Sequence, residues 1–476
     1  MQRLGDFFTR LTRRLLPDPM VLACLLTIFV IAVGICAPQI DELRSMSIAR
    51  RPIAVAGIWL GAVWNAGFLT FALQMCVVLL TGFGLARAPL ALRGLKRLAS
   101  LARSNRSAVL LIGLTSCVGC WINWGFGLIL AGLLATEIRR QMRGKGIGCQ
   151  YGLIVAAAYA GMMIWHGGFS GSAPLKAASD GGFAIEVRDG DSIRTESVPA
   201  VSISGTTLSA ANLGLAAVLI IGVPLALAAM GRRKVEIAGD ETEPTHEEKE
   251  PDVVEQRARK LADVLNESRV LSLTIATLIL VVLGRRLVAE GTDAVDLNFV
   301  NSLFLGLGLA LHRNLLTYIA AVTEGGRSIV GIVIQFPLYS GIQGVMFGTG
   351  LAAAISQSFV GASVAVADVL HVGVEHTFPV ATFFSAGLVN LFVPSGGGQW
   401  IVQGPIMCGA AQTLGTSFEQ TIMAIAYGDQ LTNMIQPFWA IPLIGMTRVS
   451  AREFMGYCAL LMLLAIPVFV VALLMY

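Results

Sequence analysis

Leu388 to Pro405 reads L-V-N-L-F-V-P-S-G-G-G-Q-W-I-V-Q-G-P, and this stretch decides the fold of the chain. Apolar residues flank it on both sides, yet its centre from Pro394 to Gln399 is poor helix material. Glycine costs about 1 kcal/mol and proline about 3 kcal/mol relative to alanine in a helix interior. Irregular backbone is tolerated at membrane depth only where protein or a water-filled cavity surrounds it. The stretch therefore predicts a broken helix whose backbone groups bind a ligand; a glycine-rich turn between two spanning helices is the alternative.

The composition is that of an α-helical membrane protein. Of the 476 residues, 55% are hydrophobic and only 13% are charged, whereas soluble domains contain about 25% charged residues. Continuous apolar runs at 19–37, 208–230 and 454–476 approach the roughly 20 residues that a spanning helix needs. A β-barrel would show short alternating segments instead. The predicted surroundings are therefore a lipid bilayer, and the net charge of +4 gives no indication of a nucleic-acid partner.

Charged segments divide the chain into four parts. Residues 1–18 alternate arginines with apolar residues, which predicts a cytoplasmic amphipathic N-terminal helix. Residues 231–269 are the longest charged stretch and predict a cytoplasmic linker between a first transmembrane half, 19–230, and a second, 270–476. Basic loops are retained in the cytoplasm. The polar, acidic segment 174–205 is therefore expected outside, where we predict a small β-hairpin.

Two acid-free basic segments, Arg87 to Arg106 and Arg139 to Lys145, bracket residues 107–138, and both are expected in the cytoplasm. The segment between them must then enter and leave on the same side, as a re-entrant helical hairpin or as two short spans. Its centre, S-C-V-G-C-W-I-N-W-G-F-G at 116–127, is small and polar, which favours the hairpin. The next helix is predicted to be broken near His166, where glycines and serines cluster.

The second half repeats this order. The hairpin predicted at 388–405 is followed by a helix interrupted between A-Y-G-D at 426–429 and Pro437. A hairpin and then a broken helix, twice, indicates inverted repeats with a binding site near the bilayer midplane. We therefore predict an all-α polytopic membrane protein with two inverted-topology repeats, each with a re-entrant helical hairpin and a broken transmembrane helix.

The predicted substrate site lies at the two hairpin tips, because backbone N–H groups at helix N-termini attract anions. Tryptophans beside the breaks offer an apolar wall for a short acyl tail. A small monocarboxylate needs this combination of donors and a modest apolar pocket. The predicted substrate-binding residues are Ser395, Gly396, Gly397, Gly398, Gln399, Asn123, Gly125 and His166, and the tryptophans are Trp121, Trp124, Trp165 and Trp400.

Asp429 is the acidic residue predicted to hold the coupling ion, because an ionisable side chain inside a span is a functional hypothesis by default. Thr432 and Asn433, with Ser116 of the first hairpin, complete the predicted coupling-ion site. Oxygen ligands suit a sodium ion, whereas a buried aspartate suits a proton, and both ions remain open. The sequence contains no Walker motif and no dinucleotide fingerprint. Direct ATP drive, an organic cofactor and a further metal are therefore not expected.

Three motifs resemble the bacterial short-chain fatty acid transporter family: N-L-F-V-P-S-G-G-G-Q-W-I-V-Q-G-P at 390–405, W-I-N-W-G-F-G-L-I at 121–129 and D-F-F-T-R…L-P-D-P near 6–19. The resemblance covers essentially the whole chain. It implies uptake of butyrate, acetoacetate and similar monocarboxylates across the bacterial cytoplasmic (inner) membrane. The family is grouped with the ion transporter superfamily. Better-characterised members there are dimers with paired re-entrant hairpins and an elevator-like motion, often coupled to sodium, and their hairpin tips carry Ser-Asn-Thr where this chain has Ser-Gly-Gly-Gly at 395–398.

The sequence thus predicts a secondary active transporter and not an enzyme: a cation-coupled symporter of short-chain fatty acids that works by alternating access. A homodimer follows only from the superfamily resemblance. Two alternatives remain. A cation/proton antiporter on the same architecture would use Asp429 without an organic substrate. An intramembrane enzyme would use His166, or the pair His371 and His376.

Overall fold

The computed structural model describes residues 1–179, 181–189, 192–232, 261–294 and 296–476. Over these residues the fold is all-α and polytopic, as predicted, with one two-stranded sheet. Nine helical segments of the described chain are long and apolar enough to cross a membrane. Residues 233–260, most of the predicted linker 231–269, lie outside the described residues.

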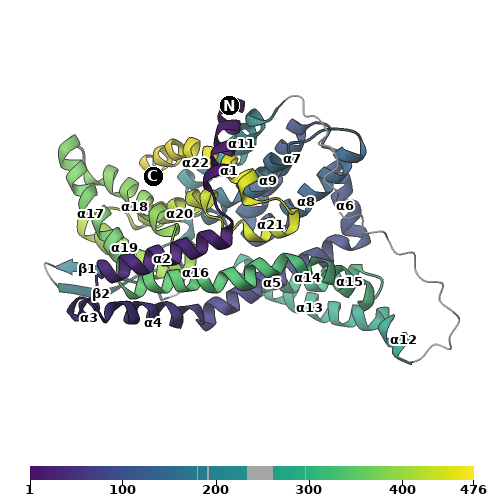
Figure 1. Cartoon of the computed structure of the whole chain (residues 1–476), viewed down its shortest axis with the longest axis horizontal. Helices are drawn as coiled ribbons and strands as arrows, with labels where there is room; N and C mark the ends of the chain where they lie inside the picture. The colour runs from purple at the N-terminus through teal and green to yellow at the C-terminus, as the bar shows by residue number, and fades with distance from the viewer. Residues whose placement is uncertain (180, 190–191, 233–260, 295) are drawn as a thin grey trace.

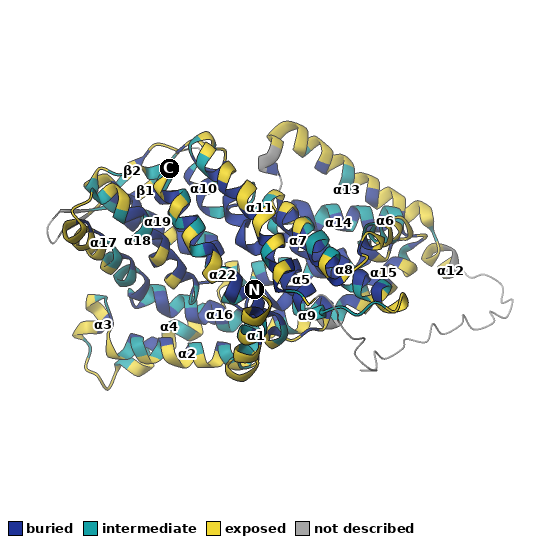
Figure 2. Ribbon diagram, turned by 90° about the horizontal axis from the view of Figure 1, so that it is seen from above, coloured by how far each residue is buried: buried dark blue, intermediate teal, exposed yellow. Residues whose placement is uncertain are grey.

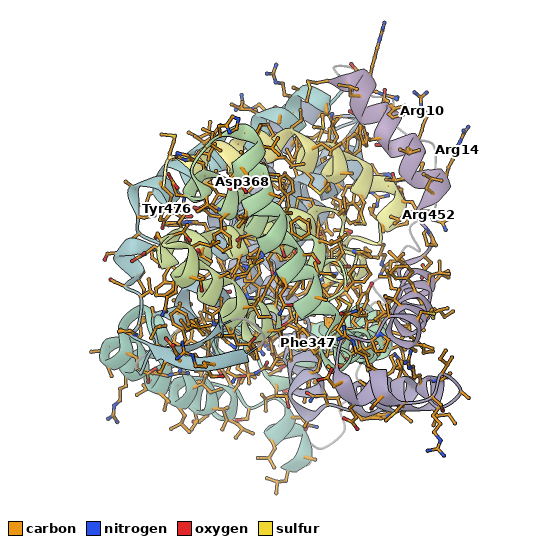
Figure 3. All side chains as sticks on the ribbon, turned by 90° about the vertical axis from the view of Figure 1, so that its left-hand side faces the viewer. Arg10, Arg14, Phe347, Asp368, Arg452 and Tyr476 are labelled. Atoms are coloured by element: carbon orange, nitrogen blue, oxygen red, sulfur yellow. The ribbon has the colours of Figure 1, made fainter. Side chains whose placement is uncertain are left out.

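The N-terminal helices are α1 (Gln2–Leu15), α2 (Pro19–Cys36), α3 (Asp41–Ser45), α4 (Arg51–Val63), α5 (Ala66–Arg87) and α6 (Pro89–Ser100). Among them, α2 to α5 lie along one flank of the molecule, whereas α1 and α6 lie away from it (Figure 1). α2, α4 and α5 lie side by side with the later helix α16 (Val330–Gly348). Arg10 and Arg14 point outward from α1 (Figure 3), while the backbone of α1 at Thr9 packs closely on Gly456 of α22 (Ala451–Leu474).

The segment between the two basic loops is a helical hairpin. α7 (Asn105–Ile122) and α8 (Trp124–Gly144) pack along each other and are separated by Asn123 alone. Asn123 caps α8, because its Oδ1 accepts a hydrogen bond from Phe126 N at 3.0 Å. Glycines permit the close approach of the two helices, since a Cβ on Gly119 would lie 2.8 Å from Gly127 Cα. We call this pair the first hairpin.

The helix that follows is broken in the middle, as predicted. α9 (Tyr151–Tyr159) gives way to the 3-10 turns η1 (Ala160–Met163) and η2 (Trp165–Gly167) before α10 (Ser172–Ala177). We call these four elements the first broken helix. Its apolar window is 89% buried, against 17% for α13 (Arg269–Glu290), whose exposed outer face is clear in Figure 2. Protein therefore surrounds the break, which is the condition under which a membrane segment tolerates irregular backbone.

The predicted β-hairpin within 174–205 is present. β1 (Phe183–Asp189) pairs antiparallel with β2 (Ser192–Val198). β1 runs against α19 (Gly396–Leu414) so closely that a Cβ on Gly409 would overlap the carbonyl group of Glu186. The ring of Phe183 meets the ring of Trp400 edge-on, with centroids 5.5 Å apart. The first half of the chain thus covers part of the second.

Eight further helical elements belong to the described chain. They are η3 (Ile203–Gly205), α11 (Ala210–Met230), α12 (Leu261–Asn266), η4 (Gly291–Ala294), α14 (Leu297–Leu311), α15 (Leu315–Gly325), η5 (Gly326–Ile329) and α17 (Leu351–Leu370). α14 and α15 pack on α5. An ion pair between Arg87 and Glu324 and a 2.7 Å hydrogen bond between His312 Nε2 and Gly84 O join these helices.

The stretch that decides the fold forms a second hairpin, α18 (Val374–Asn390) and α19, joined by residues 391–395. The sequence predicted that the three glycines would break the helix, but they form the first turn of α19 and the break precedes them. Ser395 caps α19 by accepting a hydrogen bond from Gly398 N at 3.2 Å. The N–H groups of a first helical turn have no intrahelical partner, so a capping serine after a proline suffices to start a helix on glycine.

The second broken helix follows: α20 (Phe418–Thr432), η6 (Asn433–Ile435) and α21 (Ile441–Thr447). A hairpin, a broken helix and a long final helix therefore occur twice along the chain, ending in α11 and in α22. The repeated order confirms the sequence interpretation at the level of the elements. The inverted orientation of the two halves and the re-entrance of the hairpins stay predictions.

Gly127→Ala should destabilise the first hairpin, because a Cβ there would overlap the backbone of Gly119 and Cys120. Overpacking of this kind costs about 1–3 kcal/mol. Thermal unfolding of the detergent-purified protein should show a lower Tm. Gly144→Ala is the matched control, since nothing lies within 4 Å of a Cβ at that end of α8. Equal unfolding temperatures for the two variants would contradict the packing of this hairpin.

Candidate functional site

The two broken helices meet at a buried histidine–aspartate contact. His166 of η2 is 0% exposed and Asp429 of α20 is 1% exposed. His166 Nδ1 lies 3.2 Å from Asp429 Oδ1, yet neither of these atoms, nor Asp429 Oδ2, makes a hydrogen bond to any described residue. Two residues that the sequence assigned to different roles, substrate binding and ion coupling, are therefore neighbours.

Backbone and side-chain contacts fix His166 in place. Ala173 N donates to its Nε2 at 3.0 Å. Gln430 Oε1 accepts hydrogen bonds from the backbone N–H groups of His166 and Gly167, at 3.0 and 3.1 Å. The break in the first broken helix is thus satisfied by a side chain from the second. Because each unsatisfied backbone group in a membrane interior costs several kcal/mol, Gln430 stabilises the break itself.

Asn390, the last residue of α18, ties the second hairpin to the second broken helix. Its Nδ2 donates to three oxygen atoms at 2.9 Å each: Asp429 O, Thr432 Oγ1 and Asn433 Oδ1. The oxygens of Thr432 and Asn433, predicted as coupling-ion ligands, therefore converge on an amide nitrogen. Tyr159 of α9 donates its hydroxyl to the backbone carbonyl of Asn433 at 2.7 Å, which brings the first broken helix to the same point.

The tip of the second hairpin contacts this centre through its glycines. A Cβ on Gly396 would lie 2.7 Å from His166 Cε1 and 3.0 Å from the ring of Trp165. A Cβ on Gly397 would lie 3.5 Å from Lys176 Nζ, and this ammonium group donates to Gly397 O at 3.4 Å. The first residues of α19 thus face an imidazole, an indole and a cation, all from the first broken helix.

Gln399 lies apart from this contact surface. Its Nε2 donates to Ala386 O at 2.9 Å and to Gln403 Oε1 at 2.8 Å, so its side chain faces the interior of the second hairpin. Of the four tryptophans, Trp124 and Trp165 lie together with Trp439, and the rings of Trp124 and Trp439 are 4.9 Å apart. Trp400 packs under the β-hairpin instead, and Trp121 packs on Phe169.

The first hairpin supports the first broken helix and does not reach Asp429. Ser116 Oγ donates to Ala158 O at 2.6 Å and accepts from Gly161 N at 3.1 Å. Asn123 serves as the helix cap. A Cβ on Gly125 would meet only Asn123 Oδ1 at 3.4 Å and Leu297 Cδ1 at 3.6 Å. The structure therefore gives Ser116, Asn123 and Gly125 other partners than His166 and Asp429.

Other candidate chemistry lies elsewhere. His371 and His376 are exposed around the junction of α17 and α18, and the described residues contain no group of three His, Cys, Asp or Glu side chains able to hold a metal ion. Two cavities of about 310 and 240 Å³ are lined by β1, α17 and α19 and by α5, α6, α8 and α14, respectively. His166 and Asp429 line neither of these two cavities, and their burial shows that their contact is closed to solvent in this conformation.

Sequence reasoning missed Asn390, Lys176 and Trp439. Asn390 could have been found, because a lone amide in the apolar run L-V-N-L-F-V needs a buried partner. Lys176 follows the first break by a few residues and reads as an ordinary loop charge. Only the fold brings it to the tip of the second hairpin.

Two hairpins, two broken helices and nine helical segments of the described chain that are long and apolar enough to span a bilayer indicate a multi-pass membrane protein. The family model described as "Short chain fatty acid transporter" matches residues 1–476. The "Putative short-chain fatty acid transporter" of Haemophilus influenzae is 34% identical over 99% of this chain and 99% of its own length. The Escherichia coli K12 protein of the same description is 35% identical over 100% of this chain and 99% of its own. The chain therefore belongs to the short-chain fatty acid transporter family, and it is a transporter rather than an enzyme, as the sequence predicted.

Two solved structures are more distant. The YdaH transporter of Alcanivorax borkumensis aligns over 96% of this chain and 97% of its own, at 16% identity and a TM-score of 0.40. Neisseria gonorrhoeae MtrF aligns over 98% of this chain and 96% of its own, at 16% identity and a TM-score of 0.33. Similarity at this level decides nothing about the site.

Asn390→Ala should destabilise the protein, because it removes the donor shared by three oxygen atoms and deprives the buried Asn433 Oδ1 of its hydrogen bond. A buried group left unsatisfied costs about 1–3 kcal/mol, and a lower Tm of the purified protein should report this loss. Asn298→Ala is the control, since Asn298 is an exposed residue whose Oδ1 accepts only from Gln74 in the described structure. A neutral Asn390→Ala would show that the second hairpin is not held at this point.

Proposed function

We propose that this protein is a secondary active transporter that carries short-chain monocarboxylates such as butyrate and acetoacetate across the bacterial cytoplasmic membrane by cation-coupled symport. Family membership and the descriptions of the two relatives support the substrate class. The observation that carries the proposal is the start of α19, where free N–H groups adjoin a cation and an indole ring. The charge of a monocarboxylate matches the N–H groups and the cation, and its short apolar tail matches the indole ring.

The carboxylate would bind at the first turn of α19. Within the described chain, the N–H groups of Gly396 and Gly397 meet no acceptor, and Lys176 Nζ lies beside them. Helix N-termini favour anions through these N–H groups and the helix dipole, and an ammonium group adds a charge-assisted hydrogen bond. Ser395 caps this turn and thereby orients it. The predicted substrate residues 395–398 would then form the carboxylate site together.

The acyl tail would lie toward Trp165, whose ring adjoins Gly396. Trp124 and Trp439 extend this surface, with ring centroids 6.2 and 6.3 Å from that of Trp165. Aromatic rings cover an alkyl chain of a few carbons without offering it a polar partner.

Alternating access would move the hairpins and broken helices against the helices α2, α4, α5 and α16. The tip of the second hairpin touches this group where Phe392 stacks on Phe29 with centroids 6.0 Å apart and where Gly398 adjoins Gln343 of α16. The closed polar centre needs such a movement to meet water on either side. We extend the elevator-like motion and the homodimer of the wider superfamily to this chain as part of the proposal.

Lys176→Met should weaken butyrate binding roughly tenfold, which corresponds to about 1.4 kcal/mol, because it removes the cation beside Gly397 while keeping the length of the side chain. The measurement is the half-saturating butyrate concentration for exchange of labelled butyrate in proteoliposomes. Protein-free liposomes supply the passive permeation of butyric acid, which is subtracted. Lys176→Arg should retain most of the affinity.

Lys145→Met is the matched control for this series, because Lys145 is an exposed lysine that follows α8. It should leave exchange unchanged. An unaltered affinity in Lys176→Met would remove the start of α19 from the carboxylate site. No exchange of butyrate or acetoacetate by the unmodified protein would refute the proposed function, and sodium-driven proton movement in its place would indicate an antiporter.

A further inference from the structure

We infer that the coupling ion is a proton carried by Asp429, and that His166 acts as a neutral hydrogen-bond donor that controls when this proton is held. The inference rests on the proposed function, because it names the coupling ion of the same transport cycle. It starts from an unusual combination: a buried carboxyl group without a hydrogen-bond partner beside an imidazole whose other nitrogen is already engaged.

The position of the proton on His166 follows from its partner. The N–H group of Ala173 can only donate, so His166 Nε2, at 3.0 Å, must accept and carries no hydrogen. A neutral imidazole has one N–H group, which therefore sits on Nδ1 and faces Asp429 Oδ1 at 3.2 Å. A charged imidazolium would place a second N–H group against that of Ala173. As long as this contact holds, His166 stays neutral.

Asp429 is then the group that changes its charge. Neither carboxyl oxygen has a hydrogen-bond partner among the described residues, and a buried carboxylate without partners is strongly disfavoured. The side chain has two ways to avoid this state. It can take up a proton, or it can remain ionised and receive the Nδ1–H group of His166 after a small reorientation. These two states differ by one proton, which is the requirement for a proton-coupled cycle.

The same surroundings disfavour sodium. A sodium ion needs several oxygen ligands, as other hard cations do. The predicted oxygen ligands Thr432 Oγ1 and Asn433 Oδ1, like the backbone oxygen of Asp429, lie 2.9 Å from Asn390 Nδ2, which donates to them. An N–H group of His166 also faces Oδ1. A cation at Oδ1 would have to turn the Nδ1–H group of His166 away, whereas a protonated Asp429 can keep it.

No other charge in the described chain competes at this point. The titratable side chains on the elements packed around the contact include Tyr159 of α9, Tyr427 of α20, Lys176 of α10, Cys117 and Cys120 of α7, Cys408 of α19 and Tyr457 and Cys458 of α22, and, in the first turns of α18, α20 and α22, Glu375, His376, Glu419, Arg452 and Glu453. Tyr159 and Tyr427 act as hydrogen-bond donors through their hydroxyl groups, to Asn433 O and Asn212 Oδ1. Lys176 is directed at Gly397 O. Glu375, Glu419 and Glu453 lie in the first turns of α18, α20 and α22, so Asp429 is the carboxyl group that contacts His166.

Gly396 links the proton to the substrate. It lies against the ring of His166, so a carboxylate held at the start of α19 sits on one side of the imidazole while Asp429 sits on another. A nearby like charge disfavours ionisation of a carboxyl group. Substrate binding therefore draws a proton onto Asp429, and departure of the substrate lets it leave. One anion and one proton cross together, without net movement of charge.

The first test is proton uptake by the purified protein in detergent, read from a pH-indicator dye in weakly buffered, sodium-free solution when butyrate is added. Where Asp429 is ionised before binding, up to one proton per chain should be taken up. The dissociation constant of butyrate should then rise by about tenfold per pH unit, as linkage requires. Asp429→Asn should bind butyrate with no proton uptake and no pH dependence.

The second test is transport by the same variant in proteoliposomes. Asp429→Asn should still exchange labelled butyrate but should not accumulate it under a pH gradient. His166→Phe removes the donor that stabilises the ionised carboxylate, so the pH midpoint of butyrate binding should move upward. Glu137→Gln is the matched control: Glu137 is a buried acid, 7% exposed, but it pairs with Arg140 on the first hairpin. It should keep both proton uptake and accumulation.

Three results would overturn the inference while leaving the proposed function intact. They are butyrate binding without proton uptake in the unmodified protein, butyrate exchange that requires sodium, and full accumulation under a pH gradient by Asp429→Asn. Loss of butyrate binding by Asp429→Asn with an unchanged Tm would also overturn it, because Asp429 would then act on the substrate. If the unmodified protein neither binds nor exchanges butyrate or acetoacetate, the proposed function itself fails.

Discussion

The structure depends on satisfying backbone groups where two helices are interrupted inside the membrane part of the protein. Gln430 accepts the N–H groups of His166 and Gly167, and Asn390 and Tyr159 bind carbonyl groups of the second break. Each broken helix is thus completed by side chains from another element. Because a membrane interior offers these groups no water, each break depends on hydrogen bonds from side chains outside its own helix.

Much of the architecture could be predicted because it follows from local chemistry. Proline and glycine mark where helices are interrupted, and unbroken apolar runs mark where they span. The exact start of α19 could not be predicted in this way, since helix propensity treats Gly396 to Gly398 as a breaker while the cap from Ser395 allows them to be helical. Capping decided this case, and its strength depends on geometry that the sequence does not show.

The candidate site was predictable in its ingredients but not in its pairing. His166 and Asp429 each stand out as polar residues at interruptions, but their contact joins positions 263 residues apart in the chain. Ser116 and Asn123 were also reasonable candidates by residue type, and the fold uses them for packing and capping instead. Only the fold, which brings distant parts of the chain together, distinguishes the pair that meets, His166 and Asp429, from the residues used for packing and capping.

The β-hairpin on α19 redraws the boundary between the parts of the protein. Its strands belong to the first half by sequence, yet Glu186 and Phe183 are pressed against Gly409 and Trp400 of the second. A rigid displacement of α19 would therefore carry this hairpin, and with it α10, in the same direction. Lys176 and the glycine turn at the start of α19, to which it donates a hydrogen bond, would move together. The group of elements that would move together is therefore drawn from both halves of the chain. Dividing the chain at the charged linker would separate α10 and the β-hairpin from α19.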